Sequence, residues 1–147
     1  MMKAEEFRIG NLLQSNKGTL LEVIELSNEN ISTKVLDRSL YPLPNGWSME
    51  PIPLTEEWLL NFGFVSDNYE FQETYFMDIS TDERYNYQTL IQAIYMDEYT
   101  NIFIKDVERG NEFDFSDSFI TKVKYVHQLQ NLYFAITNTK LTLKTEK

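Results

Sequence analysis

Short apolar segments separated by turn-forming residues are the feature that most constrains the fold of this chain. In residues 1–50, the segments FRIGNLLQ, LLEVIEL and ISTKVL alternate with SNKGT and SNEN, which are rich in Asn, Ser and Gly. Apolar runs of about four to eight residues bounded in this way are typical of strands joined by hairpins. The four prolines of YPLPNGWSMEPIP exclude a helix and suit an edge strand or an irregular rim. We therefore expect residues 1–54 to form a small SH3-like β-barrel.

A second group of strand-like segments runs from Tyr69 to Val123. YEFQETYFMDI, LIQAIYM, NIFIKDVE and EFDFSDSFITKV are rich in Ile, Phe, Tyr and Thr, and they alternate partly between apolar and polar residues. Hairpin turns are expected at DEYTN (97–101) and ERGN (108–111), and a loop at the polar piece STDERYNYQ (80–88). The pattern predicts an antiparallel meander of three or four strands with acids along one solvated face.

The segment KYVHQLQNLYFAIT predicts an amphipathic helix of about four turns near the end of the chain. Apolar residues at spacings of three and four define its packed face, which is expected to lie on the meander and to carry Val126, Leu129, Tyr133 and Ile136. The opposite face is expected to carry mostly His127, Gln130, Asn131 and Phe134. Asn138 is suited to the left-handed residue that caps such a helix.

The segment PIPLTEEWLLNFGF (51–64) predicts a structural joint between the barrel and the meander. Thr55 is a favourable N-cap, and Gly63 suits a left-handed helix end at which Phe64 folds back on Leu59. A helix of about two turns cannot hold itself, so Trp58 and Leu59 are expected to pin it by packing. The predicted fold class is therefore α+β, with one lobe in residues 1–54. Residues 55–147 are expected to hold the short helix, the meander and the C-terminal helix as one continuous unit.

Composition and charge exclude several classes of function. The chain has no cysteine, which excludes disulfides, cysteine–zinc sites and thiol nucleophiles. No apolar run is long enough for a signal-peptide core or a membrane span, so we expect a cytoplasmic protein. The net charge is −10, and residues 51–120 carry fifteen acidic and only three basic side chains. Such a segment repels a phosphate backbone, and direct nucleic-acid binding is therefore not expected.

Recognisable catalytic motifs are missing from the sequence. His127 is the only histidine, and its neighbours by helix geometry include no acid–base partner, so we interpret it as a packing or surface residue. The acids lack the spacing of a calcium-binding loop, and a solvated surface is their simpler interpretation. We expect no cofactor and no metal. A hydrolase with a carboxylate-held metal is an alternative that requires three or more acids to converge from among Asp78, Asp82, Glu83, Asp97, Glu98, Asp106, Glu108, Glu112, Asp114 and Asp117.

The acidic and aromatic residues that follow the joint are the best candidates for contacts with a protein partner. Exposed tyrosines beside acids, with few lysines, are typical of protein-binding patches. The predicted interaction surface consists of Glu112, Asp114, Asp117, Asp97, Glu98, Tyr95 and Tyr99. Rows of carboxylates could also compete with nucleic acid for a basic protein. Self-association would give the surplus of aromatic residues a structural use, so a homo-oligomer is a further option.

Three segments together resemble a known family. FRIGNLL, PIPLTEEWLLNFGF and YVHQLQNLYFAIT are similar, in this order, to segments of an uncharacterised family of small proteins from Bacteroides-group gut bacteria and their phages and prophages. The chain departs from the family at TNTKL, where Thr-Gly-Glu-Glu-Leu is frequent, and this change concerns the helix cap. The resemblance implies an intracellular protein associated with mobile elements, and it implies no activity, cofactor or catalytic residue.

These observations favour a non-enzymatic accessory protein of a phage or mobile element that acts by protein–protein binding. One alternative is a counter-defence inhibitor that masks a host protein, as an acidic mimic of nucleic acid, or that sequesters a small signalling molecule. The metal-dependent hydrolase is the second alternative.

Overall fold

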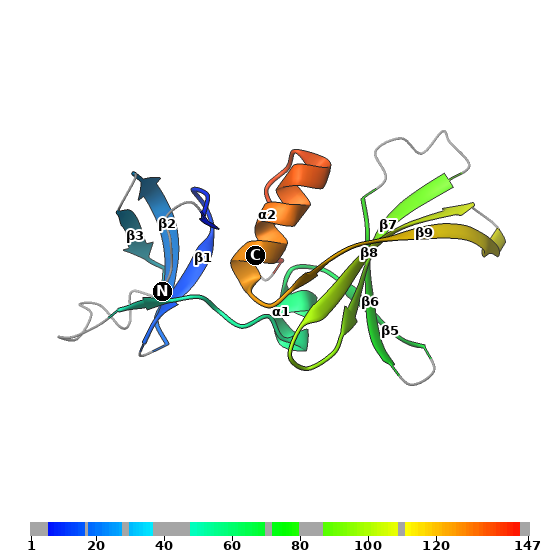
Figure 1. Ribbon diagram of the computed structural model, residues 1–147, viewed down its shortest axis with the longest axis horizontal. Coiled ribbons are helices and arrows are strands. Elements are labelled where there is room, and N and C mark those ends of the chain that lie inside the picture. Colours follow the sequence, from blue (N-terminus) through cyan, green and yellow to red (C-terminus); the bar gives the residue numbers. More distant parts are fainter. Residues whose placement is uncertain are drawn as a thin grey trace. The chain divides into compact units, whose positions relative to one another are not determined.

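A computed structural model shows that the chain folds into two compact units (Figure 1). The first unit consists of Met1–Pro53 and Tyr125–Leu141, and the second of Leu54–Lys124 and Thr142–Lys147. The predicted division into 1–54 and 55–147 differs from this one, because residues 125–141 belong to the first unit. The structure describes residues 6–16, 18–27, 30–36, 48–69, 72–79, 87–108 and 111–144.

The first unit contains a four-stranded antiparallel sheet in the order β3-β2-β1-β4 (Figure 1). Its strands are β1 (Leu12–Ser15), β2 (Leu20–Leu26), β3 (Ile31–Val35) and β4 (Met49–Glu50). The first three strands follow one another as a meander, and β4 returns to pair with β1. The sheet thus forms a barrel-like half, and the expectation of short strands joined by hairpins is confirmed for these residues.

A small apolar cluster holds this sheet together. Phe7, Leu13, Leu21 and Val23 are buried, and the partly buried residues packed against them are Leu26, Ile31, Val35 and Met49. Leu13 and Leu21 are also opposite one another in the β1–β2 ladder. Burying a side chain of this kind stabilises a fold by roughly 1.5–3 kcal/mol. In the first half of β2, buried positions alternate with more exposed ones, as the apolar pattern of its sequence predicted.

The C-terminal helix, α2 (Val126–Thr137), belongs to the first unit. The sequence analysis grouped this helix with residues 55–147, so its unit differs from the predicted one. The backbone N–H of Tyr125 donates to Gln128 Oε1 at 3.1 Å at its start. Asn138 adopts the left-handed conformation at its end (φ 58°) and its N–H donates to the Phe134 carbonyl at 2.7 Å. The predicted left-handed cap is thus confirmed.

The faces of α2 differ from those that the periodicity predicted. The buried residues of the helix are Val126, His127, Leu129 and Gln130. Ile136, expected on the packed face, is 36% exposed. Periodicity counts apolar side chains only, whereas the first two turns of α2 also bury polar side chains. The buried Gln130 amide hydrogen-bonds to the segment around β1.

The second unit contains a five-stranded antiparallel meander in the order β5-β6-β7-β8-β9 (Figure 1). The strands are β5 (Val65–Tyr69), β6 (Gln72–Asp78), β7 (Tyr87–Tyr95), β8 (Thr100–Glu108) and β9 (Asn111–Val123). The predicted meander is confirmed, although it has one strand more than expected. The missed strand is β5, whose sequence VSDNY is mostly polar.

The predicted connections of the meander are confirmed where the structure describes them. The turn between β7 and β8 is closed by the N–H of Met96, which donates to the Tyr99 carbonyl at 2.9 Å. Asp97 takes a left-handed conformation in this turn, with φ 82°. Glu108 and Asn111 are partners at the end of the β8–β9 ladder, as the ERGN turn requires. Residues 80–86 of the expected loop lie outside the described residues.

The short helix α1 (Glu56–Asn61) confirms the predicted joint in detail. Thr55 Oγ1 accepts the N–H of Trp58 at 3.4 Å, and the N–H of Phe64 donates to the Leu59 carbonyl at 3.0 Å. Gly63 has φ +106°, the left-handed conformation that such a helix end requires. Leu59 and Phe64 are buried, which pins the helix to the second unit. The change from the first unit to the second falls between Pro53 and Leu54.

Replacing Gly63 by valine should lower the free energy of unfolding by about 2 kcal/mol, because a left-handed backbone is unfavourable for L-residues and worse for β-branched ones. A Cβ at this position would also lie 2.5 Å from Cδ of Lys144, so that this side chain would have to move. Urea denaturation followed by tryptophan fluorescence measures the loss. Gly63→Asn is the matched control, since Asn tolerates the left-handed region. Equal losses in both variants would contradict a role for backbone conformation.

Candidate functional site

The five-stranded sheet has two different faces, and α1 packs on one of them. On this inner face Tyr75, Ala93 and Ile102 are opposite one another in successive strands, and all three are buried. The Tyr75 hydroxyl donates to Glu56 Oε2 on α1 at 2.7 Å, which fixes the helix to this side. The inner face is therefore the core of the second unit.

A row of large side chains crosses the outer face of the same sheet. The strand registers pair Val65 with Phe76, Phe76 with Gln92, Gln92 with Phe103, and Phe103 with Phe119. We call these five residues the phenylalanine row. Val65 is 68% exposed and Phe119 is 54% exposed, and the other three are half-buried. The Phe103 and Phe119 rings meet edge to face, with their centroids 5.5 Å apart.

Lysine side chains lie beside the aromatic rings of this region. Lys105 Nζ lies 5.5 Å from the centre of the Phe76 ring, and Lys122 Nζ lies 4.4 Å from the centre of the Tyr99 ring. Both distances suit a cation–π interaction. The expectation of an acidic solvated face concerns mainly the acids of β9, whose side chains lie outside the described part of the structure. Two register shifts between β8 and β9 interrupt the alternation along this strand.

Of the seven residues of the predicted interaction surface, the structure describes the side chains of four. Asp97 and Glu98 are exposed in the turn between β7 and β8, and Tyr99 lies under Lys122. Tyr95 is partly buried on the inner side of the sheet, where it pairs with Thr100. Burial raises its pKa, with smaller contributions from the carboxylates of Asp97 and Glu56.

The remaining three predicted residues are on β9, and their side chains lie outside the described part of the structure. These residues are Glu112, Asp114 and Asp117. The backbone register separates them from the β7–β8 turn. That turn leads into Thr100, whose partner is Val123, whereas Asp117 is opposite Lys105 further along β8.

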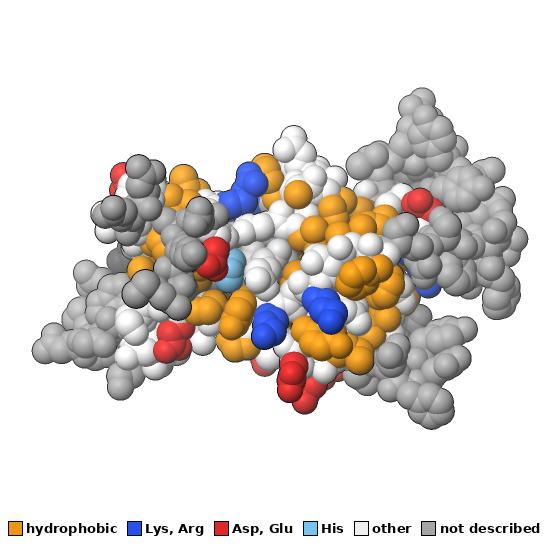
Figure 2. All heavy atoms as spheres, viewed as in Figure 1, with side chains coloured by type: hydrophobic (Ala, Val, Ile, Leu, Met, Phe, Trp, Pro, Cys, Tyr) orange, Lys and Arg blue, Asp and Glu red, His pale blue; other side chains and the backbone are white. Residues whose placement is uncertain are grey.

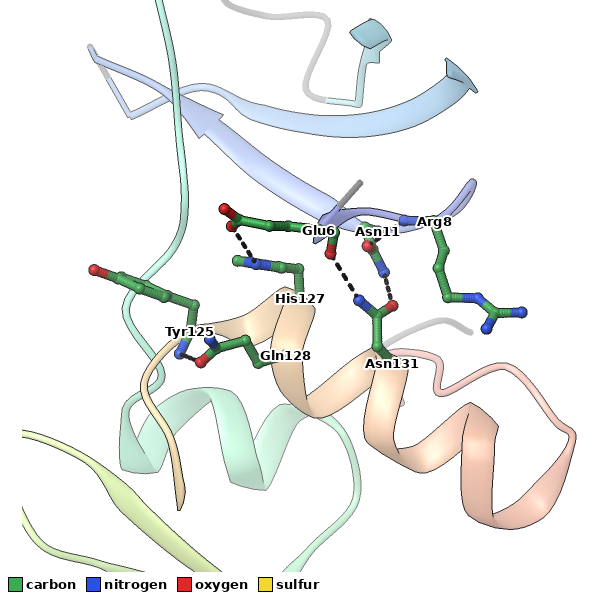
Figure 3. A network of polar contacts seen from close by, with 7 residues as sticks. All are labelled: Glu6, Arg8, Asn11, Tyr125, His127, Gln128 and Asn131. Carbon is green, nitrogen blue, oxygen red and sulfur yellow. Dashed lines mark hydrogen bonds and ion pairs between the residues drawn. The ribbon is translucent and has the colours of Figure 1, made fainter. Parts of the chain in front are cut away.

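The first unit contains a second cluster of interest, in which polar side chains join α2 to the segment before β1 (Figure 3). The Asn11 side chain accepts the N–H of Arg8 at 2.7 Å and donates to Asn131 Oδ1 at 2.9 Å. Asn131 Nδ2 in turn donates to the Glu6 carbonyl at 3.1 Å. The Arg8 guanidinium stands 4.1 Å from the centre of the Phe134 ring. Each amide is held at both ends, which is typical of a structural network.

Gln130 extends this network into the interior. Its Oε1 accepts the backbone N–H of Leu12 at 2.9 Å, and its Nε2 donates to the Gly10 carbonyl at 3.3 Å. The side chain is almost fully buried, with 6% of the residue exposed. Gln130 therefore completes the backbone hydrogen bonding at the start of β1, as a neighbouring strand would.

His127 is buried between two aromatic rings. Its ring centre lies 4.3 Å from that of Phe7 and 5.8 Å from that of Tyr125. Nε2 is 3.9 Å from Glu6 Oε1, whereas Nδ1 is buried without a hydrogen-bond partner (Figure 3). Burial lowers the pKa of His127 below its ordinary value of 6.5, and the Glu6 carboxylate opposes this in smaller part. The packing interpretation is thus confirmed, with the ring neutral at neutral pH.

Sequence reasoning missed the phenylalanine row and the amide network for the same reason. Phe76, Phe103 and Phe119 come from three different strands, and only the register brings them together. Asn11 and Asn131 are separated by 120 positions. The available signal was that RIGN and HQLQN lie in two of the three segments that carry the family resemblance, which did not say that they meet.

Removing the Gln130 amide should destabilise the first unit strongly. Gln130→Leu leaves the Leu12 N–H and the Gly10 carbonyl buried without partners, at a cost of about 3 kcal/mol. Gln128→Leu is the matched control on the same helix, where the side chain is exposed, and it should cost no more than about 1 kcal/mol. Chemical denaturation measures the free energy of unfolding of both variants. Similar losses of this free energy would show that the buried hydrogen bonds of Gln130 do not stabilise the unit more than the exposed side chain of Gln128 does.

Acidification should destabilise the protein through His127. Below pH 6.5 the unfolded chain binds a proton at this residue that the folded chain resists, so the free energy of unfolding falls as the pH drops through 6.5 towards the lower pKa of the folded state. His127→Phe, which keeps the ring packing, should lose this part of the pH dependence. Urea denaturation across this range measures the effect. A His127 pKa at or above 6.5 in an NMR titration would contradict the prediction.

Among the residues that the structure describes, no three His, Cys, Asp or Glu side chains are placed to hold a metal ion. Within the same residues, no helix is long and apolar enough to cross a membrane. No protein-family model, curated protein or solved structure matches this chain.

Proposed function

We propose that this chain is a non-enzymatic accessory protein that acts by binding another protein through the outer face of its five-stranded sheet. The observation that carries the proposal is the phenylalanine row, which crosses all five strands and leaves Phe119 54% exposed. The predicted acidic patch is replaced in this proposal by an aromatic surface. Asp97 and Glu98 would lie outside its centre, at the turn between β7 and β8.

The composition of this face is what a protein interface requires. The solvated face of an antiparallel sheet is ordinarily polar, because each strand alternates between core and water. Here Phe76 and Phe103 flank Gln92 on the central strand, and Phe119 follows on β9. Aromatic residues are enriched at the buried centres of interfaces. Covering Phe119 alone would contribute roughly 1 kcal/mol or more to binding. A partner with a flat or convex apolar surface fits this row best.

The biological setting of the proposal comes from the sequence resemblance. Two of the three segments that carry it meet in the first unit, where Asn11 bonds to Asn131 and Leu12 bonds to Gln130. We therefore attribute their specificity to folding, and we assign partner binding to the sheet of the second unit. On this basis the chain is a cytoplasmic protein of a phage or mobile element, and the aromatic face receives a protein of the phage or of its host.

The SH3-like identity of the N-terminal lobe is part of the same proposal. Its support is the strand order β3-β2-β1-β4, in which the last strand returns to pair with the first. A returning strand of this kind is typical of small barrels, and it covers the edge of β1. In this proposal the lobe and α2 form a stable unit, and the second unit provides the binding surface.

The proposal is tested by quantitative capture from a lysate of a Bacteroides host. The immobilised wild-type chain should retain a defined protein, and Phe119→Asp should reduce its capture about tenfold or more. Leu60→Asp is the matched control, because Leu60 is 49% exposed on α1. Figure 2 shows hydrophobic side chains gathered where α1 lies, so this control also probes a different apolar area. Equal capture by the wild type and Phe119→Asp, or loss in Leu60→Asp alone, would refute the proposal.

A further inference from the structure

We propose that the segment 142–144 is a strap that locks α1 in its folded state, so that release of this segment frees the helix while the sheet beside it stays folded. The strap is a conformational device of the second unit, to which both the segment and α1 belong. It concerns the helix on the inner side of the sheet, whereas the proposed function uses the outer face. The two proposals are therefore independent of each other.

The length of α1 is the first observation. With six residues the helix is well below the roughly 12–15 residues that an isolated helix needs, so it depends on contacts at its ends. At its start, Thr55 accepts the N–H of Trp58. Its last turn, WLLN, contains no basic residue that would interact favourably with the negative end of the helix dipole. The C-terminal end of α1 therefore needs help from elsewhere in the chain.

The second observation is a hydrogen-bond donor that the strap supplies to this end. The last carbonyl groups of a helix have no partner within the helix. Here the carbonyls of residues 58–60 accept N–H groups from residues 62–64, each at 3.0 Å. The carbonyl of Asn61 instead accepts the N–H of Lys144 at 2.7 Å. A residue from a distant part of the sequence thus completes the cap of α1.

The side chain of Lys144 is the third observation. Its stem lies against Gly63, where an added Cβ would be 2.5 Å from Cδ and 3.2 Å from Cγ of the lysine. Gly63 therefore leaves room for the strap in addition to forming the left-handed helix end, with φ +106°. The lysine also brings a positive charge close to the C-terminal end of the helix, where cations are favourable.

Burial along the segment shows how the strap is held. Leu141, the residue before the strap, is only 3% exposed, and Leu143 is half-buried. Thr142 and Lys144 are exposed. The strap thus follows a buried leucine, and its far end is held by one backbone hydrogen bond and the lysine stem. A single hydrogen bond of this kind changes the ratio of locked to released α1 by roughly tenfold, so the lock can open without global unfolding.

The order of the elements gives the lock a direction in folding. All five strands of the meander, β5 to β9, lie between α1 and the strap in the sequence. α1 is therefore locked only after the sheet on which it packs has been synthesised. Before that point the helix has its N-terminal cap but lacks the donor for the Asn61 carbonyl.

Amide hydrogen exchange of the full chain, followed by NMR, tests the proposal. Lys144→Pro removes the donated N–H, because proline has no amide hydrogen. Exchange at the amides of Leu59 and Phe62 in and beside α1 should then become about tenfold faster. The amides of Ile91 and Ile102, on the central strands of the sheet, should keep their wild-type exchange rates.

Lys144→Ala is the matched control, since it removes the stem and the charge but keeps the N–H. It should accelerate exchange in α1 by no more than about threefold. Unchanged exchange in α1 of Lys144→Pro overturns the proposal, and so does an equal acceleration in both variants. Acceleration of the same size at Ile91 and Ile102, or loss of the folded state in a thermal melt, also overturns it, because the segment would then stabilise the whole sheet.

Discussion

The five-stranded sheet of the second unit has two faces, and α1 covers only one of them. The packing of α1 on that face determines which side chains of the unit are buried. α1 has only six residues and is tied to the inner face by the hydrogen bond from Tyr75 to Glu56. Its capping and its left-handed end at Gly63 place Leu59 in the core. The outer face receives no comparable helix among the described residues of the unit. The exposure of Phe119 is a direct consequence, and an aromatic surface of this kind is favourable only where a partner removes it from water.

The first unit is stabilised differently, because buried polar side chains hold it together in addition to a small apolar core. Gln130 completes the hydrogen bonding around β1, and the Asn11–Asn131 pair fixes the approach to that strand. A fully paired amide network is specific in geometry, so it locks α2 in one register. Its weak point is His127, whose buried Nδ1 has no partner. Burial lowers the pKa of this ring, so protonation of His127 is expected to destabilise the unit.

Local signals in the sequence were sufficient for the joint, the hairpins and the C-terminal cap. Each helix-end residue contacts only backbone groups a few positions away, so its role can be predicted from its neighbours in the sequence. These residues are Thr55, Gly63 and Asn138. The burial of Gln130 and the alignment of Phe76 with Phe103 depend on partners from distant segments. Periodicity carries no such information, which explains why α2 was grouped with the second unit and why the phenylalanine row was not predicted. β5 was missed because a polar edge strand lacks the apolar signal.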